Sequence, residues 1–459
     1  IIRNKEDFPT DNFLDVRDSL HKIKNDVTAW LSEEEISNLM NSLQAINNIV
    51  NYLHAAKTDK GEFKYPALTI MADSIKIFPV IIDKANSILD KSSHQVKDNA
   101  SRQLADIRRN KMEATKAVSR NMQNAIRDAQ KAGLLGKDAS ISLRDGHMVI
   151  PVDAANKRKI KGRVHDGSGS GKTVFIEPEA VAEANNRLRE LEADERREVV
   201  KILIEFTDLI RPHLSDLSHS YNFMGDIDFI RAKALFGVRI NGIKPIFENK
   251  QQVEWAQAIH PLLNIQLFQQ GKQAHPLDIV LNEKNRLLIV SGANAGGKSL
   301  CLKTVALLQY MLQCGLLIPV HENSRTGIFD HIFVDIGDGQ SIENSLSTYT
   351  SHLTNMKYFV EQCDNKTLIL IDEFGSGTEP QIGGAIAETL LDRFNRKGSF
   401  GVITTHFQNL KHFAYETDGI INGAMLYDAE RMQPLYRLSI GNPGSSFAVE
   451  VATRIGLSK

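Results

Sequence analysis

The feature that most constrains this chain is the loop 292–299, which reads Gly-Ala-Asn-Ala-Gly-Gly-Lys-Ser. The apolar run Leu287–Ser291 precedes it, and a helical pattern of apolar residues extends from Leu300 to Cys314 after it. A glycine-rich loop that ends in Lys-Ser between a strand and a helix is the Walker A pattern, whose backbone N–H groups surround a polyphosphate. A bare turn is the alternative, but the flanking strand and helix favour a phosphate-binding loop.

The residue types of this loop assign roles to two side chains. Lys298 is expected to contact the outer phosphates, and the Ser299 hydroxyl to occupy one coordination position of Mg²⁺. The start of the following helix adds a dipole that favours an anion. We therefore predict ATP and Mg²⁺ as cofactors. The predicted ATP-binding residues are Gly292, Ala293, Asn294, Ala295, Gly296, Gly297, Lys298 and Ser299.

Two further strand ends carry polar side chains that phosphoryl transfer requires. The apolar run 367–371 ends in Asp372 and Glu373, as a buried parallel strand does when it delivers carboxylates to a sheet edge. We predict that Asp372 holds Mg²⁺ through water and that Glu373 orients or deprotonates the attacking water. The run 401–405 ends before His406. A single histidine after a strand is more often structural, but behind these two motifs we predict that His406, like Glu373, is catalytic.

Four motifs, in order along the chain, resemble those of the MutS ATPases. They are the loop 292–299, the segments Gly337–Tyr349 and Asp372–Pro380, and the strand end Thr404–His406. Within this superfamily, the stretch Lys161–Pro178 and the following Ala184–Glu192 are similar to the second bacterial MutS paralogue. The resemblance extends over nearly the whole chain.

The resemblance implies an ATPase of ABC-type architecture that forms a homodimer. In that architecture Ser345, Ser347 and Thr348 reach the γ-phosphate bound by the opposite subunit, so that two chains share each ATP site. Gln340, in the same segment, is a candidate for coupling nucleotide binding to conformational change.

The chain departs from the usual family pattern at several positions. Ala293, Ala295 and Ser299 stand where Pro, Thr or Met, and Thr are common, and Tyr349 stands where Phe is common. Serine retains the hydroxyl that coordinates Mg²⁺, so the chemistry is expected to survive. The chain starts with Ile rather than Met, and no Asp-Leu-His-Gly-like motif of the Smr nuclease domain occurs up to Lys459. We therefore expect an excised fragment without nuclease activity.

Composition sets few further limits on the fold and function of the chain. A chain of 459 residues fits about three domains, and 55 basic against 56 acidic residues give a net charge of −1. With a net charge near zero, no overall electrostatic attraction draws such a chain to nucleic acid. Nucleic-acid binding would therefore need local basic patches. Cys301, Cys314 and Cys363 are odd in number and lack C-x-x-C spacing, which suggests neither a disulfide framework nor a zinc site. Without a signal-like segment or a long apolar run, we expect a cytoplasmic protein that does not contact membranes.

Periodicity predicts a multidomain chain: an α-helical core with long lever helices and a small β-containing insertion, followed by an α/β domain that contains the P-loop. The resemblance implies that the insertion is a clamp and that the α/β P-loop domain is an ATPase of ABC type. Helical spacing of apolar residues runs from Phe13 to Trp30, and Ser32–Glu35 matches a capping box. A polar helical stretch from about Ser93 would reach roughly 60 Å over about 40 residues. The predicted boundaries are 1–92 for the core, 93–133 for the outgoing lever, 134–178 for the insertion, 179–237 for the returning lever and core, and 238–459 for the ATPase domain.

The predicted insertion has a local excess of basic residues. Runs at 148–152, 159–164 and 173–176 are typical of short strands. The candidates for contact with nucleic-acid phosphates are Lys157, Lys159, Lys161 and Arg163. A solvated hairpin face is an equally good interpretation of these charges.

Two motif-like patterns in the insertion are not assigned a function. The segment 167–173 ends like a Walker A loop but leads into a strand pattern rather than a helix. Phe175–Glu177 has the Phe-x-Glu form of mismatch-reading MutS proteins, which carry it in a separate N-terminal domain. A motif outside its structural context is weak evidence for its function.

Together, these inferences predict that the chain is an ATP-hydrolysing dimeric clamp whose arms grip and release a large partner. By the resemblance, branched or recombining DNA is the leading partner, and suppression or processing of recombination the role. The same family is associated with stalled or collided ribosomes, so ribosomal RNA is an open alternative. A structural tether of SMC type, in which ATP only closes the dimer, is another. Glu373 argues against the tether, because a site without hydrolysis needs no water-positioning acid.

Overall fold

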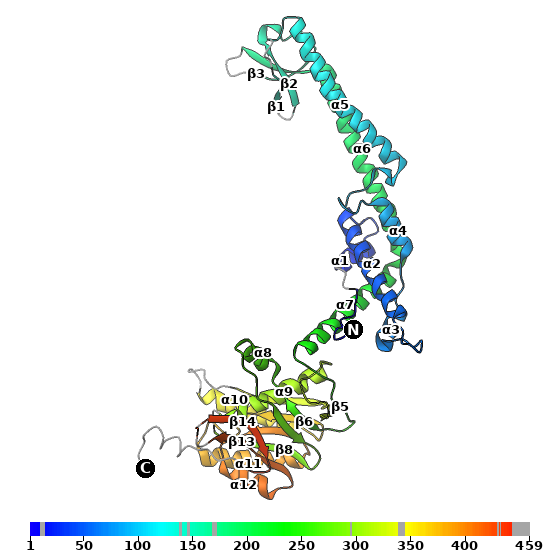
Figure 1. Cartoon of the computed structure of the whole chain (residues 1–459). Coiled ribbons are helices and arrows are strands. Elements are labelled where there is room, and N and C mark those ends of the chain that lie inside the picture. Colours follow the sequence, from blue (N-terminus) through cyan, green and yellow to red (C-terminus); the bar gives the residue numbers. More distant parts are fainter. Residues whose placement is uncertain are drawn as a thin grey trace. The chain divides into compact units, whose positions relative to one another are not determined.

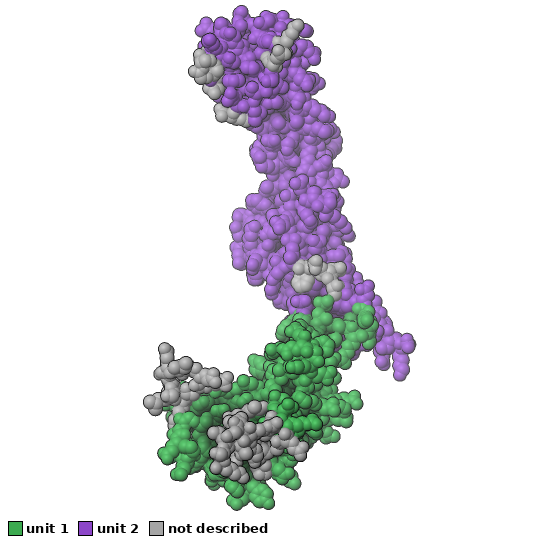
Figure 2. Space-filling view, turned by 60° about the vertical axis from the view of Figure 1, so that its left-hand side comes forward, with its two compact units in different colours: residues 1–6, 229–459 green, residues 7–228 purple. Residues whose placement is uncertain are grey.

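The computed structural model describes residues 1–459 except 10–13, 137–139, 145–146, 168–171, 294–295, 338–344, 429–430, 432 and 443–459, and at 166 and 345–349 it describes the backbone alone. The chain forms two compact units, one of Asp7–Asp228 and one of Ile1–Glu6 with Phe229–Lys459 (Figure 2). Both units contain helices and sheet, so the fold is mixed and multidomain. None of the helices in the described ranges is long and apolar enough to cross a membrane.

The unit Asp7–Asp228 begins with a cluster of helices. They are α1 (Arg17–Asn25), α2 (Glu33–Ala55), α3 (Pro66–Asp73) and α4 (Pro79–Ile88). Buried residues of these helices, such as Ile23, Ile36 and Leu53, form one core with Phe206 from later in the chain. This core explains the helical spacing of apolar residues in the sequence.

Local hydrogen bonds set the ends of the first two helices. The predicted capping box is confirmed: the Ser32 hydroxyl accepts from the Glu35 N–H at 3.2 Å, and the Glu35 carboxylate accepts from the Ser32 N–H at 2.7 Å. The helical pattern that continued to Trp30 was misleading, because α1 ends at Asn25. The Asp26 carboxylate accepts from both the N–H and the hydroxyl of Thr28, and this turn competes with further helix.

Two long helices, α5 (Arg102–Lys131) and α6 (Glu179–Ile210), lie side by side in the same unit (Figure 1). Glu195 of α6 forms ion pairs with Arg108 and Lys111 of α5 at 2.8 and 2.7 Å. With 30 and 32 residues, the helices measure about 45 and 48 Å at 1.5 Å per residue, less than the predicted 60 Å. Helix α6 starts at Glu179, the first residue of the predicted returning segment 179–237, and ends at Ile210.

The outgoing helix begins later than predicted, at Arg102 rather than near Ser93. The Asp90 carboxylate accepts hydrogen bonds from the N–H and hydroxyl groups of both Ser92 and Ser93, which holds the chain in a turn. Helix α5 starts only after Ser101, whose hydroxyl accepts from the Leu104 N–H at 3.0 Å. Side-chain capping therefore defines this boundary.

Between α5 and α6 the chain forms a four-stranded antiparallel sheet in the order β1-β2-β4-β3. The strands are β1 (Ser142–Arg144), β2 (His147–Asp153), β3 (Gly162–Gly167) and β4 (Thr173–Pro178). The predicted short strands are confirmed, with β3 starting at Gly162 instead of Lys159. Ile150 and Ile176 face inward and pack against Val118 and Met122 of α5.

Helix α7 (Leu214–Arg239) leads along the chain into the second unit, which contains two sheets. The larger has six strands in the order β10-β11-β12-β8-β13-β14. Its strands are β8 (Asn285–Ser291), β10 (His331–Asp335), β11 (Thr367–Ile371), β12 (Phe400–Thr404), β13 (Gly419–Asp428) and β14 (Gln433–Ile440). The first five in spatial order run parallel, and β14 is antiparallel to β13.

The smaller sheet has the order β5-β9-β6-β7. Its strands are β5 (Ile246–Phe247), β6 (Val253–Ala258), β7 (Leu277–Leu281) and β9 (Arg325–Thr326). The helices of this unit are α8 (Pro261–Gln269), α9 (Lys298–Gln313), α10 (Ser345–Gln362), α11 (Pro380–Arg396) and α12 (Gln408–Glu416).

Helices cover both faces of the six-stranded sheet. Leu288 and Val290 of β8 share a core with Leu302 of α9, whereas Ile289 faces the opposite core with Leu391 of α11. The central strands are therefore buried on both sides, which explains their continuous apolar sequences. Polar residues remain only where these strands end.

Candidate functional site

The polar residues that the sequence singled out lie at one edge of the six-stranded sheet. Strands β11, β12 and β8 are neighbours and run parallel, so their carboxyl ends meet at the same edge. The glycine-rich loop after β8, the two acids after β11 and His406 after β12 therefore share this edge. In open α/β sheets, ligands bind at this kind of edge.

The glycine-rich loop holds a buried cation. It connects β8 to α9, and Lys298 is the first residue of α9. Lys298 is only 4% exposed, and its ammonium donates to the carbonyl oxygens of Gly292 at 2.9 Å and Ala293 at 3.3 Å. Burial lowers the pKa of Lys298, while the charges of Asp372 and Glu373 oppose this lowering. A buried cation and the N-terminal end of a helix thus lie together, which suits an anion.

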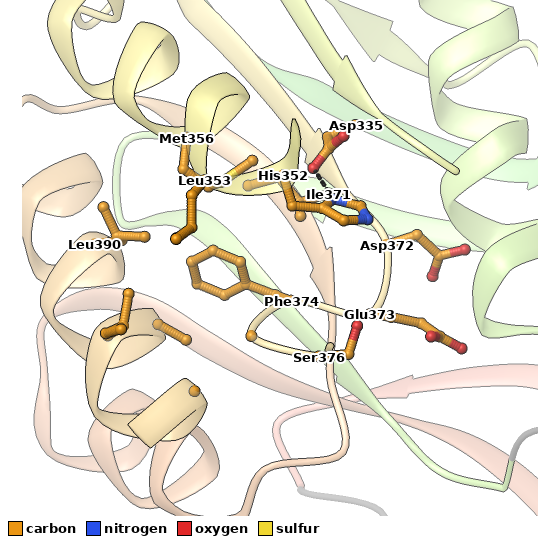
Figure 3. A pocket seen from close by; sticks show the side chains of 14 residues that line it. Asp335, His352, Leu353, Met356, Ile371, Asp372, Glu373, Phe374, Ser376 and Leu390 are labelled. Atoms are coloured by element: carbon orange, nitrogen blue, oxygen red, sulfur yellow. Dashed lines mark hydrogen bonds and ion pairs between the residues drawn. The ribbon is translucent and has the colours of Figure 1, made fainter. Parts of the chain in front are cut away.

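The two acids are anchored by Thr404 at the end of β12. The Thr404 hydroxyl donates to Asp372 Oδ1, and its oxygen accepts from the backbone N–H of Glu373 at 2.8 Å. Glu373 has a positive φ of 51°, a conformation that costs a non-glycine residue about 1–2 kcal/mol. The two carboxylates project to the same side of the strand end (Figure 3). The anchoring depends on the pairing of β11 with β12, so the sequence motif alone did not reveal it.

An ion pair that the sequence did not predict lies beside the acids. Asp335, the last residue of β10, is 6% exposed, and its Oδ2 lies 2.6 Å from Nδ1 of His352 on α10. Its Oδ1 accepts from the Asn355 amide at 3.0 Å, and its backbone carbonyl accepts from the Asp372 N–H at 2.9 Å. Asp335 and His352 line a pocket into which Phe374 projects (Figure 3). No motif links these residues, because α10 has to pack on β10 before they meet.

The ion pair makes stability depend on pH. The hydrogen bond from Asp335 raises the pKa of His352, against the opposing effect of burial, and the Asp335 charge adds to the rise. Since the folded-state pKa is raised, this stabilisation is complete below the unfolded pKa of about 6.5 and is lost as pH rises through the folded-state pKa.

We expect His352→Gln to lower the free energy of unfolding by about 1–3 kcal/mol below pH ~6, and by less at higher pH. Urea denaturation across this pH range measures the difference from the unsubstituted chain. His412→Gln, at an exposed position of α12, is the matched control. A deficit for His352→Gln that stays constant with pH would contradict the assignment.

His406 lies just beyond β12 with an exposed side chain. Partial burial and the charge of Lys298 lower its pKa, with opposing effects from Glu373 and Asp372. Its imidazole is therefore neutral at neutral pH. The structure thus brings His406 to the same edge as the buried lysine and the two acids.

A largely apolar pocket lies against the glycine-rich loop, and sequence reasoning did not find it. The rings of His275 and Tyr436 stack in its wall with centroids 5.5 Å apart and an interplanar angle of 26°. Gly297 has a φ of 94°, and a Cβ atom there would lie 3.1 Å from the Tyr436 ring, so the loop and this ring are in close contact. The two aromatic residues are far apart in the sequence, and no local signal connects them.

Several predicted site residues lie outside the described part of the chain. Asn294, Ala295 and Gln340 are not described, and of Ser345, Ser347 and Thr348 only the backbone is, as the first turn of α10. Ser299 is described as the second residue of α9 and is half-buried. The basic candidates of the insertion belong to the other unit.

Comparison with known proteins defines the family. The model of MutS domain V matches residues 288–459, which contain the glycine-rich loop and the strand ends described above. Over the full chain, similarity extends to proteins of the same family. The chain belongs to the MutS family, as its motifs indicated.

Among MutS proteins the chain is similar to those named endonuclease MutS2. It is 37% identical to that of Ligilactobacillus salivarius (strain UCC118) and 35% identical to that of Geobacillus sp. (strain WCH70), in each case over 100% of this chain and 57% of the relative. The protein of Finegoldia magna (strain ATCC 29328) is 38% identical over 90% of this chain and 52% of the relative. The chain thus spans little more than half the length of these relatives.

Proposed function

We propose that this chain binds MgATP at the edge of the six-stranded sheet and hydrolyses it. One observation carries the proposal: the buried Lys298 at the start of α9, which follows β8, and the acids Asp372 and Glu373, which follow β11, lie at the same carboxyl edge of the parallel strands. A buried cation at a helix start beside two carboxylates is the arrangement that phosphoryl transfer uses. Membership of the MutS family supports the same activity.

Each of the described side chains has a proposed role in ATP binding or hydrolysis. Lys298 exchanges its two loop carbonyls for phosphate oxygens. Ser299 and Asp372 are the residues that would hold Mg²⁺, because hydroxyl and carboxylate oxygens are its preferred ligands, and the bound ion neutralises phosphate charge. Glu373, whose backbone is fixed by Thr404, orients the attacking water. His406, neutral and exposed, is available to hydrogen-bond this water or the γ-phosphate.

The apolar pocket beside the loop is the proposed site of the nucleobase. It touches the phosphate loop at Gly297 and the first turns of α9 at Leu300 and Thr304. The stacked rings of His275 and Tyr436 provide the flat surface that a purine needs. This assignment extends the proposed site from the phosphates to the base.

Thr404 is proposed as a positioning residue for both acids. We expect Thr404→Val to lower the ATP turnover number by about 10- to 100-fold, since a lost hydrogen bond to a charged group is worth about 1.5–3 kcal/mol. Steady-state phosphate release measures this loss. Thr367→Val is the matched control. Thr367 is as buried as Thr404, but it is the first residue of β11, at the end of the strand that lies away from Asp372 and Glu373. Equal turnover in the two variants would remove Thr404 from this role.

The proposed working unit is a homodimer with composite ATP sites, completed in each case by the α10 start of the other subunit. In this dimer, ATP binding and hydrolysis move the paired helices α5 and α6, which act as levers for the insertion, and so control the grip on a large partner. Branched or recombining DNA is the favoured partner, with recombination as the process it affects. Ribosomal RNA of stalled ribosomes is the second candidate, favoured by the same basic surface. An SMC-type tether is the alternative without productive hydrolysis.

The basic surface of the insertion supports an anionic partner. Lys157, Lys159, Lys161 and Arg163 are exposed, and within the described residues none of them forms an ion pair. We expect their joint replacement by Ala to weaken nucleic-acid binding and to flatten its salt dependence, by roughly 0.7–0.9 in logarithmic slope for each lost phosphate contact. Basal ATP turnover should survive, because the insertion belongs to the other compact unit.

Salt titrations with branched DNA, linear duplex and ribosomes test this surface and rank the partners. The matched control replaces Lys24, Lys60, Lys84 and Lys91, which are exposed lysines elsewhere in the same unit, and so changes the net charge equally. If both quadruple variants have the unsubstituted slope, the insertion residues only solvate the hairpin, and the binding surface lies elsewhere.

The ATPase proposal itself is tested by nucleotide titration and phosphate release on the unsubstituted chain and on Lys298→Ala. We expect saturable MgATP binding and turnover that Lys298→Ala abolishes. A chain that binds no MgATP, or a Lys298→Ala variant that binds it unchanged, would refute the assignment of the site.

A further inference from the structure

Two histidines and a glutamate converge in the sheet of the insertion, which belongs to the unit Asp7–Asp228. His147 is the first residue of β2, His165 lies in β3, and Glu177 lies in β4. Glu177 Oε2 lies 2.8 Å from His165 Nε2 and 3.0 Å from His147 Nδ1, and the two imidazole rings have centroids 4.4 Å apart. One potential ligand atom from each residue lies within 4.8 Å of the others.

The carboxylate in this cluster is buried without a permanent cation. Glu177 is 2% exposed, and its partners within the described residues are the two imidazoles and the Asn185 amide. A buried carboxylate is costly unless a positive charge compensates it. Neutral imidazoles provide hydrogen bonds but no charge, whereas a divalent cation between the three side chains would provide it.

The surrounding side chains orient the carboxylate towards the two imidazole rings. Asn185 of α6 donates to Glu177 Oε1 at 2.9 Å, which turns Oε2 towards both rings. Metal-binding carboxylates usually have this kind of supporting hydrogen bond. His147 Nδ1 is buried and lies 3.0 Å from Oε2, but its alignment is too poor for a good hydrogen bond.

We propose that His147 Nδ1, His165 Nε2 and Glu177 Oε2 form a binding site for a divalent transition metal of the Zn²⁺ class. Two imidazoles and one carboxylate are a common zinc ligand set, with a fourth position left for water. Ligand bonds of about 2.0–2.1 Å in a tetrahedron place the ligand atoms roughly 3.3 Å apart, so the two separations from Glu177 Oε2 to the imidazole nitrogens need to widen by only a few tenths of an ångström. The rings of His147 and His165 are 18% and 11% exposed, which leaves a path for the ion.

A bound ion would join three strands of the insertion and, through Asn185, connect them to α6. Among the described residues, one neighbour opposes it. The Arg189 guanidinium lies 3.3 Å from His147 Nε2, and because arginine can only donate, that contact needs an Nε2 without a proton. Metal binding at Nδ1 of a neutral ring needs a proton on Nε2 instead. Arg189 is exposed and free to turn away, so the ion displaces it.

Titration of the full chain with Zn²⁺ against a chromophoric chelator tests the site. We expect one tight equivalent of Zn²⁺, weakened at least ~10²-fold in His147→Gln or His165→Gln and by about 10- to 100-fold in Asn185→Ala, the usual effect of losing a supporting residue. Arg189→Ala should bind Zn²⁺ more tightly. His412→Gln, an exposed histidine elsewhere, is the control and should bind as the unsubstituted chain does.

Co²⁺ substitution distinguishes this site from the cysteines of the chain. We expect visible d–d absorption without the thiolate charge-transfer band that Cys301, Cys314 or Cys363 would produce. Far-ultraviolet circular dichroism confirms that each variant is folded, and His147→Gln, at the most exposed ligand, keeps the test open if His165→Gln does not fold. Absence of a tight Zn²⁺ equivalent, unchanged affinity in folded His147→Gln, or a thiolate-dominated spectrum would overturn the proposal.

Discussion

Glu373→Gln is expected to bind MgATP as the unsubstituted chain does and to lose at least ~10²-fold in turnover. The reason is that a positioned general base or water-orienting group typically contributes 10²- to 10⁴-fold to a rate. The substitution keeps the hydrogen bond from the backbone N–H of residue 373 to the Thr404 hydroxyl oxygen. The local geometry is therefore retained while the carboxylate charge is lost. Phosphate release and a nucleotide titration on the same protein separate turnover from binding.

The matched control for this prediction is Glu416→Gln, an exposed acid at the end of α12 that should leave turnover unchanged. Loss of MgATP affinity in Glu373→Gln would mean that the carboxylate contributes to ion binding rather than to hydrolysis. Unchanged turnover would remove Glu373 from the mechanism and would favour the tether alternative.

Mixed dimers are expected to recover activity that neither parent variant has. We expect Lys298→Ala chains to lack nucleotide binding and Ser347→Ala chains to lack hydrolysis. If Ser347 acts on the ATP of the other subunit, a heterodimer has one doubly damaged site and one intact site. Mixing the two proteins should then restore about a quarter of the unsubstituted activity, since random exchange makes half of the dimers mixed and each has one working site.

The control for subunit sharing is a mixture of Lys298→Ala with Glu373→Gln chains. Both residues are proposed for the same subunit's part of a site, so every site of this heterodimer is damaged and activity should stay absent. Recovery in this control, or no recovery in the Ser347 mixture once subunit exchange has been verified, would contradict the composite site.

The sequence was most informative where a short segment determines both structure and chemistry. Strands β8, β11 and β12 appeared as apolar runs because they are buried on both faces, and parallel pairing brings their polar ends to one edge. The capping box at Ser32 and the start of α6 at Glu179 were also predictable, since they depend on residues close in sequence.

Features that depend on contacts between distant segments were not predictable. The Asp335 and His352 ion pair requires α10 to pack on β10, and the stacking of His275 on Tyr436 requires β14 to return beside the loop. The cluster around Glu177 draws one residue from each of three strands. In each case the residue types are ordinary in the sequence and become informative only through tertiary structure.

Helix ends were misjudged where a side chain competes with the backbone for hydrogen bonds. Asp26 and Asp90 each accept from residues two or three positions later, which ends α1 early and delays the start of α5. Apolar periodicity does not record this competition. Helix α5 is consequently shorter than the polar helical stretch that the sequence predicted.

The most direct test of the account is the affinity for branched DNA in different nucleotide states. Glu373→Gln chains held with MgATP, the same chains with MgADP, and unsubstituted chains without nucleotide are compared at one salt concentration, because affinity depends strongly on salt. We predict that affinity differs at least ~10-fold, or about 1.4 kcal/mol, between the ATP and ADP states. Equal affinity in all states, with ATP binding verified, would contradict a clamp controlled by ATP.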